Sequence, residues 1–219
     1  MRLPFALLLA GSCADVWDVE QIDLPAPDPC NPDAQVPPTI VLGGQFLDTT
    51  NNAPIEGLSI NANPGGVAPT DAMGRFAIVL DTAGFPAYLS LIASGNAAYP
   101  THEIYYQRPF VRDPSDGSNK LLPTFAIDSL YESPRAPDRA TALISIRNCA
   151  DEGVDRVTVE TEPAATIVYQ GGGTATNGTG VGYALNVPSG AVTVRAGRAA
   201  EFELAVEAGE MAIVYLVAP

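Results

Sequence analysis

The sequence predicts an all-β protein made of two tandem antiparallel β-sandwiches, and three observations support that prediction. One pattern occurs twice, first in residues 54–76 and again, roughly a hundred residues later, in residues 153–180. An internal repeat of this length indicates two similar domains. The chain holds 20 glycines and 20 prolines, many of them where turns are expected, which favours strands and loops over helices. Short runs also alternate apolar and polar residues, as half-buried strands do.

The first copy lies in a domain that is predicted to span residues 39–110. This first copy is predicted to contain a turn at residues 70–74, where Asp71 can accept hydrogen bonds from the backbone and Gly74 can adopt positive φ. Strands are expected before and after this turn, at residues 40–47, 58–62, 76–80, 88–93 and 102–107. Their apolar face is expected to form a core from Phe46, Ile60, Phe76, Ile78 and Leu80.

Three stretches of this domain resemble the carboxypeptidase regulatory-like family, whose fold is a transthyretin-like β-sandwich. Residues 44–48 end a strand in the form G-x-x-x-D, residues 54–57 read Pro-Ile-Glu-Gly, and residues 70–76 read Thr-Asp-Ala-Met-Gly-Arg-Phe. The resemblance implies a fold and carries no catalytic residues. The peptidase that gives the family its name needs a zinc domain, which this sequence does not show.

The second domain is predicted at residues 140–219 and departs further from the family. In the second copy, Gly153 stands where the first copy has Pro54, and Arg156 stands where it has Gly57. The turn of the second copy therefore need not match that of the first. Residues 211–217 are apolar on both faces, which predicts a central strand. We expect two Ig-like/transthyretin-like sandwiches with separate cores that superpose. The second core is expected to contain Val157, Val159, Tyr183, Leu185, Leu204 and much of residues 211–215.

Residues 111–139 are predicted to link the two domains, because four prolines interrupt them. Residues 125–131 are expected to form one short helix capped by Thr124. Residues 113–119 superficially resemble a calcium loop, but they miss the EF-hand spacing and no glutamate closes them, which favours a turn. Residues 177–179 fit a glycosylation sequon and are also better explained as a turn.

The N-terminus is predicted to direct export. Residues 1–12 hold a basic start and an apolar run that is too short to span a bilayer, which needs about 20 residues. Small residues before Cys13 resemble the lipobox of bacterial lipoproteins, which implies that the leader is cut there and that Cys13 carries lipid. In that family Ala14 favours sorting to the outer membrane or cell surface. Residues 13–38 are rich in proline and acids and are expected to form an extended tether.

Composition and motifs exclude several function classes. The formal net charge of −14 repels phosphate backbones, so nucleic acid is not an expected partner. The single histidine, His102, argues against most histidine-based metal sites and against a Ser–His–Asp triad. No nucleotide-binding or nucleophile motif occurs, so we expect no cofactor, no metal and no enzyme activity. A two-carboxylate hydrolase is a remote alternative, because acids are plentiful but no pair stands out.

One aromatic patch is a candidate ligand site, formed by Tyr99, His102, Tyr105, Tyr106 and Phe110. Neighbouring residues of a strand face opposite ways, so either Tyr105 or Tyr106 could fill the core while the other stacks on a carbohydrate or peptide. The alternative is that both serve packing and protection of a sheet edge.

The sequence does not decide whether the two cysteines besides Cys13 form a disulfide. If Cys13 carries lipid, Cys30 and Cys149 remain in an oxidising compartment, where they either form a disulfide or stay as two thiols. A Cα separation within about 7 Å would allow the bond. The expected function is a non-catalytic, lipid-anchored cell-envelope module with a structural or interaction role. Its expected partners are the membrane, through the anchor, and an envelope protein or glycan.

Overall fold

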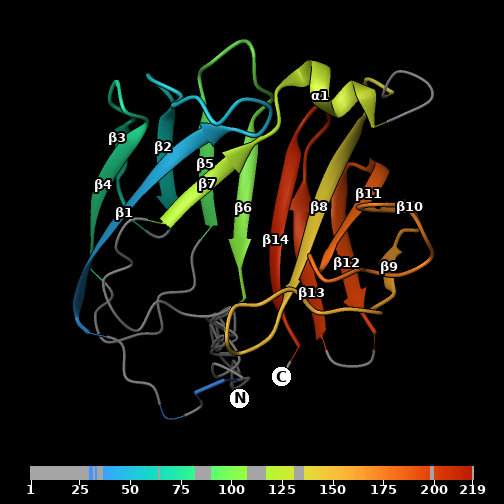
Figure 1. Ribbon diagram of the computed structural model, residues 1–219. Coiled ribbons are helices and arrows are strands. Elements are labelled where there is room, and N and C mark those ends of the chain that lie inside the picture. The colour runs from blue at the N-terminus through green and yellow to red at the C-terminus, as the bar shows by residue number, and fades with distance from the viewer. Residues whose placement is uncertain are drawn as a thin grey trace, which may run out of the picture.

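The protein is nearly all β in the computed structural model, which describes residues 30, 31, 33, 37–63, 65–81, 90–107, 117–130, 136–197 and 200–218 (Figure 1). The leader, Cys13 and Phe110 lie outside these residues. The first seven strands are β1 (Thr39–Asp48), β2 (Ser59–Asn63), β3 (Val67–Pro69), β4 (Arg75–Asp81), β5 (Ser90–Ser94), β6 (His102–Tyr106) and β7 (Gly117–Leu121). One helix, α1 (Thr124–Ser129), precedes β8 (Arg139–Arg147), β9 (Val159–Glu162), β10 (Thr166–Tyr169), β11 (Val181–Pro188), β12 (Gly190–Ala196), β13 (Ala200–Val206) and β14 (Met211–Val217).

The strands form two sandwiches that have one sheet in common. A long sheet, called the shared sheet below, runs in the order β10-β11-β8-β14-β6-β5-β2-β3. Two smaller sheets have the orders β4-β1-β7 and β13-β12-β9. The first sandwich places β4-β1-β7 against the β2, β5 and β6 part of the shared sheet, and the second places β13-β12-β9 against the β8, β11 and β14 part.

The strand β14 joins the two sandwiches, because it pairs in parallel with both β6 and β8 (Figure 1). Met211 and Ile213 are buried in the first core, whereas Ala212, Val214 and Leu216 are buried in the second. Successive side chains of a strand point to opposite faces, so the two cores lie on opposite faces of the shared sheet. The prediction of a central strand is confirmed. Much of residues 211–215 was expected in the second core, but only Ala212 and Val214 are buried there, because the side chains of the strand alternate between the two cores.

The internal repeat extends to individual hydrogen bonds. In the first copy, the Thr70 hydroxyl accepts from Leu58 N at 2.9 Å and donates to Ile55 O at 2.7 Å. In the second, the Thr176 hydroxyl accepts from Val157 N at 3.0 Å and donates to Val154 O at 2.7 Å. The strand pairs correspond as well, since β1–β4 and β1–β7 match β8–β11 and β8–β14 in direction.

The turn of the second copy matches the first despite its different residues. Arg156 has a φ of 59°, in the left-handed region that Gly57 occupies with a φ of 77°. Arg156 N donates to Thr176 O, as Gly57 N donates to Thr70 O. The backbone arrangement is therefore kept even where the residue that favours it is not.

The predicted first core is confirmed, whereas two residues of the predicted second core are only half-buried. Phe46, Ile60, Phe76, Ile78 and Leu80 are all buried in one cluster. Val157 is half-buried at the margin of the second core, and Tyr183 is half-buried on the other side of β11 from Gly182 and Ala184. The register of β11 shifts between Ala184 and Val187, so an uninterrupted alternation from Tyr183 onward assigns the wrong face.

The segment that was expected to be a linker contains two ordered elements. The strand β7 pairs in parallel with β1 and brings Leu121 into the first core. The helix α1 begins at Thr124 rather than being capped by it, and Pro123 at the N-cap makes no side-chain hydrogen bond to the helix. The Thr124 hydroxyl instead donates to Ala98 O at 3.4 Å, because the start of the helix lies against the loop between β5 and β6.

Candidate functional site

Two of the aromatic residues singled out in the sequence, Tyr105 and Tyr106, lie at the junction between the sandwiches, where β6 meets β14. Tyr106 stacks on Tyr215, with 5.2 Å between ring centroids and 6° between ring planes. The Tyr106 hydroxyl donates to Asn119 Oδ1 at 2.9 Å. Burial, followed by the neighbouring Tyr215, raises the pKa of Tyr106 above its ordinary value. Tyr106 thus connects β6, β7 and β14 on the side of the first core.

Tyr105 projects from the opposite face of β6, as the sequence predicts. Its ring meets Phe202 edge-on, with 5.8 Å between centroids, and its hydroxyl donates to Ala205 O at 2.8 Å. Burial raises the pKa of Tyr105, and a hydrogen bond and the charge of Glu103 add to the shift. Tyr105 therefore packs against the second core, although it belongs to the first sandwich.

Tyr99 forms a hydrogen-bonded pair with Asp48, the last residue of β1. The Tyr99 hydroxyl donates to Asp48 Oδ2 at 2.6 Å, and Asp48 also accepts from the backbone N–H and the hydroxyl of Thr50. Burial alone would raise the pKa of Asp48, but the bonds from Thr50 and Tyr99 outweigh it and lower that pKa. Burial, the bond to Asp48 and its charge raise the pKa of Tyr99 to about 12.

His102 is fully buried, and both ring nitrogens meet backbone groups. Nδ1 lies 2.8 Å from Pro100 O, and Nε2 lies 3.2 Å from Leu122 N. This pattern suits a neutral ring that donates through Nδ1 and accepts through Nε2. His102 therefore holds the loop before β6 to the segment that follows β7.

The three described tyrosines of the predicted patch pack against the two cores. Tyr99, Tyr105 and Tyr106 are half-buried, and each hydroxyl donates to a protein acceptor. They are distributed over both faces of the shared sheet and do not form one surface. This arrangement favours the packing role, and binding of a carbohydrate or peptide stays a prediction.

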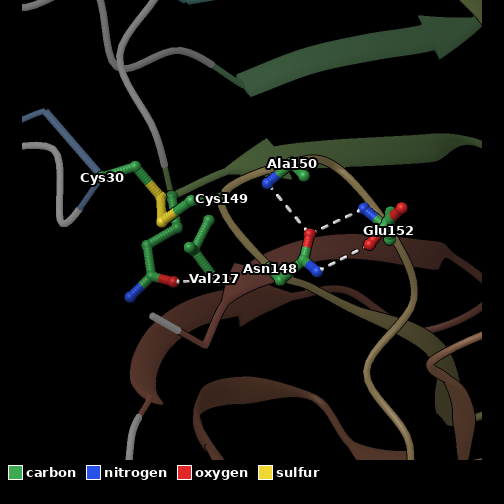
Figure 2. The surroundings of a disulfide bond; sticks show 7 residues. Cys30, Asn148, Cys149, Ala150, Glu152 and Val217 are labelled. Carbon is green, nitrogen blue, oxygen red and sulfur yellow. Dashed lines mark hydrogen bonds between the residues drawn. A yellow bond between two sulfur atoms is a disulfide. The ribbon is translucent and has the colours of Figure 1, made fainter.

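Cys30 and Cys149 are joined by a disulfide, with 5.4 Å between their Cα atoms (Figure 2). Of the two alternatives left open by the sequence, the structure therefore has the bond. Cys149 lies in a tight turn after β8, in which Asn148 Oδ1 accepts from the backbone N–H groups of Ala150 and Glu152, both at 2.9 Å. The bond fixes the start of the described chain to the second sandwich.

The sequence did not indicate the residues that contact Tyr105, Tyr106 and β14 at this junction. They are Gln107 after β6, Asn119 in β7 and Phe202 in β13. Gln107 Oε1 accepts from Val217 N at 2.7 Å, and Gln107 N donates to Tyr215 O at 3.1 Å. Asn119 and Phe202 supply the remaining contacts to the tyrosines. The one signal for this junction was the run at 211–217 that is apolar on both faces, because such a strand needs cover from two sides.

Other predicted features give no further site among the described residues. No group of three or more His, Cys, Asp or Glu side chains in these residues could hold a metal ion. No helix among them is long and apolar enough to cross a membrane. Asn177 lies in a turn, where its Oδ1 accepts from Thr179 N and its Nδ2 donates to Gln170 O. Part of the calcium-like segment, residues 113–116, lies outside the described chain, and residues 117–119 belong to β7.

Comparisons with known proteins find distant likenesses in structure only. No family model and no curated protein matches the chain. The Bacillus anthracis TIE protein is 13% identical with a TM-score of 0.27, and the match covers 83% of this chain and 34% of that one. A Streptococcal ancillary pilin is 10% identical with a TM-score of 0.27, covering 83% and 63%. The shaft pilin SpaA from Lactobacillus rhamnosus GG is 9% identical with a TM-score of 0.24, covering 80% and 96%.

The chain therefore spans about a third of the TIE protein and less than two thirds of the ancillary pilin. No family membership follows from these likenesses.

Proposed function

We propose that the protein is a non-catalytic, lipid-anchored module of the cell envelope, with its two sandwiches acting as one rigid structural or interaction unit. The observation that supports rigidity is the junction of β6 and β14, which continues one sheet through both sandwiches. Tyr105 and Tyr106 fix this junction from both faces of the sheet. A sheet that continues through both sandwiches, with side chains packed on both of its faces, restricts hinge motion between the two sandwiches.

Export is supported by two independent features. Residues 1–13 have the form of a lipoprotein leader with its cysteine. The disulfide between Cys30 and Cys149 is a bond that persists in oxidising compartments and is rare in reducing ones. An envelope protein or glycan is the proposed partner, because these are the molecules that a module held in the envelope meets. The net charge of −14 disfavours nucleic acid.

The anchor is tested by expressing the full chain in a Gram-negative host that is fed a fatty acid with a chemical handle. We expect the handle on the protein, loss of Met1–Ser12, and recovery in the outer-membrane fraction. Cys13→Ser should abolish labelling and release the protein from membranes. Ala14→Asp is the matched control, because it should keep the lipid and move the protein to the inner membrane. Native protein that still carries Met1–Ser12 would refute the proposal.

A further inference from the structure

The disulfide encloses the first sandwich in a covalent loop. Cys30 and Cys149 are separated by 119 positions in sequence, and between them the chain forms β1 to β8. A force that enters before Cys30 therefore has two covalent paths to Cys149. One path is the long backbone of the first sandwich, and the other is the disulfide itself, which joins Cα atoms 5.4 Å apart.

The attachment point lies at the end of the shared sheet where β14 ends. Cys149 follows Arg147, the last residue of β8, and Arg147 is paired with Val217, the last residue of β14. Ala218 N donates to Arg147 O at 2.8 Å, which continues this pairing past the strand. Figure 2 shows Cys30, Cys149 and Val217 close together, and Figure 1 places the C-terminus at the same end of the shared sheet.

We propose that the Cys30–Cys149 disulfide makes the second sandwich the mechanical attachment point of the protein and removes tension from the backbone of the first. The first sandwich is then carried as a side branch, held through β6 and β14. Only the source of tension, an N-terminal anchor, rests on the proposed function. The covalent path does not depend on lipid at Cys13.

The bond also determines which hydrogen bonds bear the load first. With the disulfide formed, tension between the N-terminal segment and the C-terminus acts on β8 and β14 at the same end. Parallel neighbours that are loaded at one end separate one hydrogen bond at a time from that end. Without the disulfide, the load enters the fold at Thr39 and passes through the first sandwich before it reaches β8.

The test is single-molecule stretching of the full chain with Cys13→Ser, held by handles at its two ends, so that Cys30 and Cys149 are the only cysteines. The oxidised protein should extend without contribution from residues 31–148. Addition of a reductant should lengthen the fully stretched protein by about 400 Å, because 119 further positions of about 3.3–3.6 Å each become extensible.

Cys30→Ser combined with Cys149→Ser is the matched control, and it should show the long extension with or without reductant. The comparison of oxidised with reduced protein needs no change at Cys30 or Cys149, so a folding defect in the control would leave the test intact. Equal extension of the oxidised and reduced proteins would overturn the proposal. It would not affect the proposed anchor, which is tested separately by labelling at Cys13.

Discussion

At the scale of single residues, the repeat is held in place by a threonine and a glycine that recur in each copy. Thr70 and Thr176 are buried, and each hydroxyl bonds both a backbone N–H and a backbone carbonyl of one facing segment, residues 55–58 or residues 154–157. Gly74 and Gly180 have φ values of 71° and 70°, and they lie against the backbone carbonyls of Phe46 in β1 and Ile146 in β8. These contacts leave room for a hydrogen atom and not for a methyl group.

The first prediction compares two glycines that have similar backbone angles and different surroundings. A Cβ at Gly180 would lie 2.2 Å from Ile146 O, whereas a Cβ at Gly172, with a φ of 83°, would meet nothing within 4 Å. Gly172→Ala should cost about 1–2 kcal/mol for the left-handed backbone alone. Gly180→Ala should cost roughly 3 kcal/mol or more, because the collision adds to that term. Denaturant unfolding measures both, and equal losses would contradict the steric argument.

At the scale of elements, β14 is the strand on which both halves depend. Its side chains alternate between the two cores, and its backbone pairs with β6 of one sandwich and β8 of the other. A strand used in this way couples the two cores, because it cannot leave one without leaving the other. The protein should therefore unfold as one cooperative unit.

The second prediction tests this coupling with Met211→Ala. Met211 is buried in the first core only, and truncating it should cost roughly 2–5 kcal/mol. Amide hydrogen exchange should accelerate in β12 of the second sandwich as well as in β5 of the first. Val168→Ala on β10 is the control, because Val168 is 39% exposed and its loss should change neither half. Faster exchange confined to β5 would show that the halves unfold independently.

At the scale of the whole molecule, five tyrosines of the described residues have a pKa raised in the same direction. Burial is the largest cause of a raised pKa for Tyr99, Tyr105, Tyr106, Tyr183 and Tyr215. A pKa that is higher in the folded state than in the unfolded state means that folding favours the protonated form. This contribution to stability is complete below about pH 10 and is lost as the pH rises further.

The third prediction is that alkali unfolds the protein cooperatively and that these tyrosines ionise together with unfolding. Tyrosinate absorbance and circular dichroism should change over the same pH range, which lies above 10, the ordinary pKa of the side chain. Protein unfolded in urea serves as the control and should titrate near pH 10. Ionisation of these tyrosines near pH 10 with native circular dichroism intact would contradict the burial argument.

The sequence was informative about local structure for physical reasons that individual residues illustrate. The alternation around Phe76, Ile78 and Leu80 predicts a half-buried strand, and all three are buried. Gly74 is the glycine of a recognisable turn, and it has the positive φ expected there. Tyr105 and Tyr106 were expected to face opposite ways, and they contact different cores.

The sequence was less informative wherever distant segments had to be matched. Nothing in Ile104 or Ile213 indicates that β6 and β14 pair in parallel, because any apolar strand could take either place. The role of Tyr106 depends on that pairing, since Tyr215 covers its ring. The disulfide was undecided for the same reason, because the distance between Cys30 and Cys149 is set by the assembled fold.

The position of β14 in the chain has a consequence for the time at which the protein can fold. Residues 211–217 follow β1 to β13 in the chain, so they are synthesised after every described strand with which they pack or pair. Domains generally begin to fold as they emerge, yet neither sandwich here is complete until this strand arrives. Both cores therefore stay open until residues 211–217 have been synthesised. Completion of the two sandwiches then becomes one late event, and not two events in sequence.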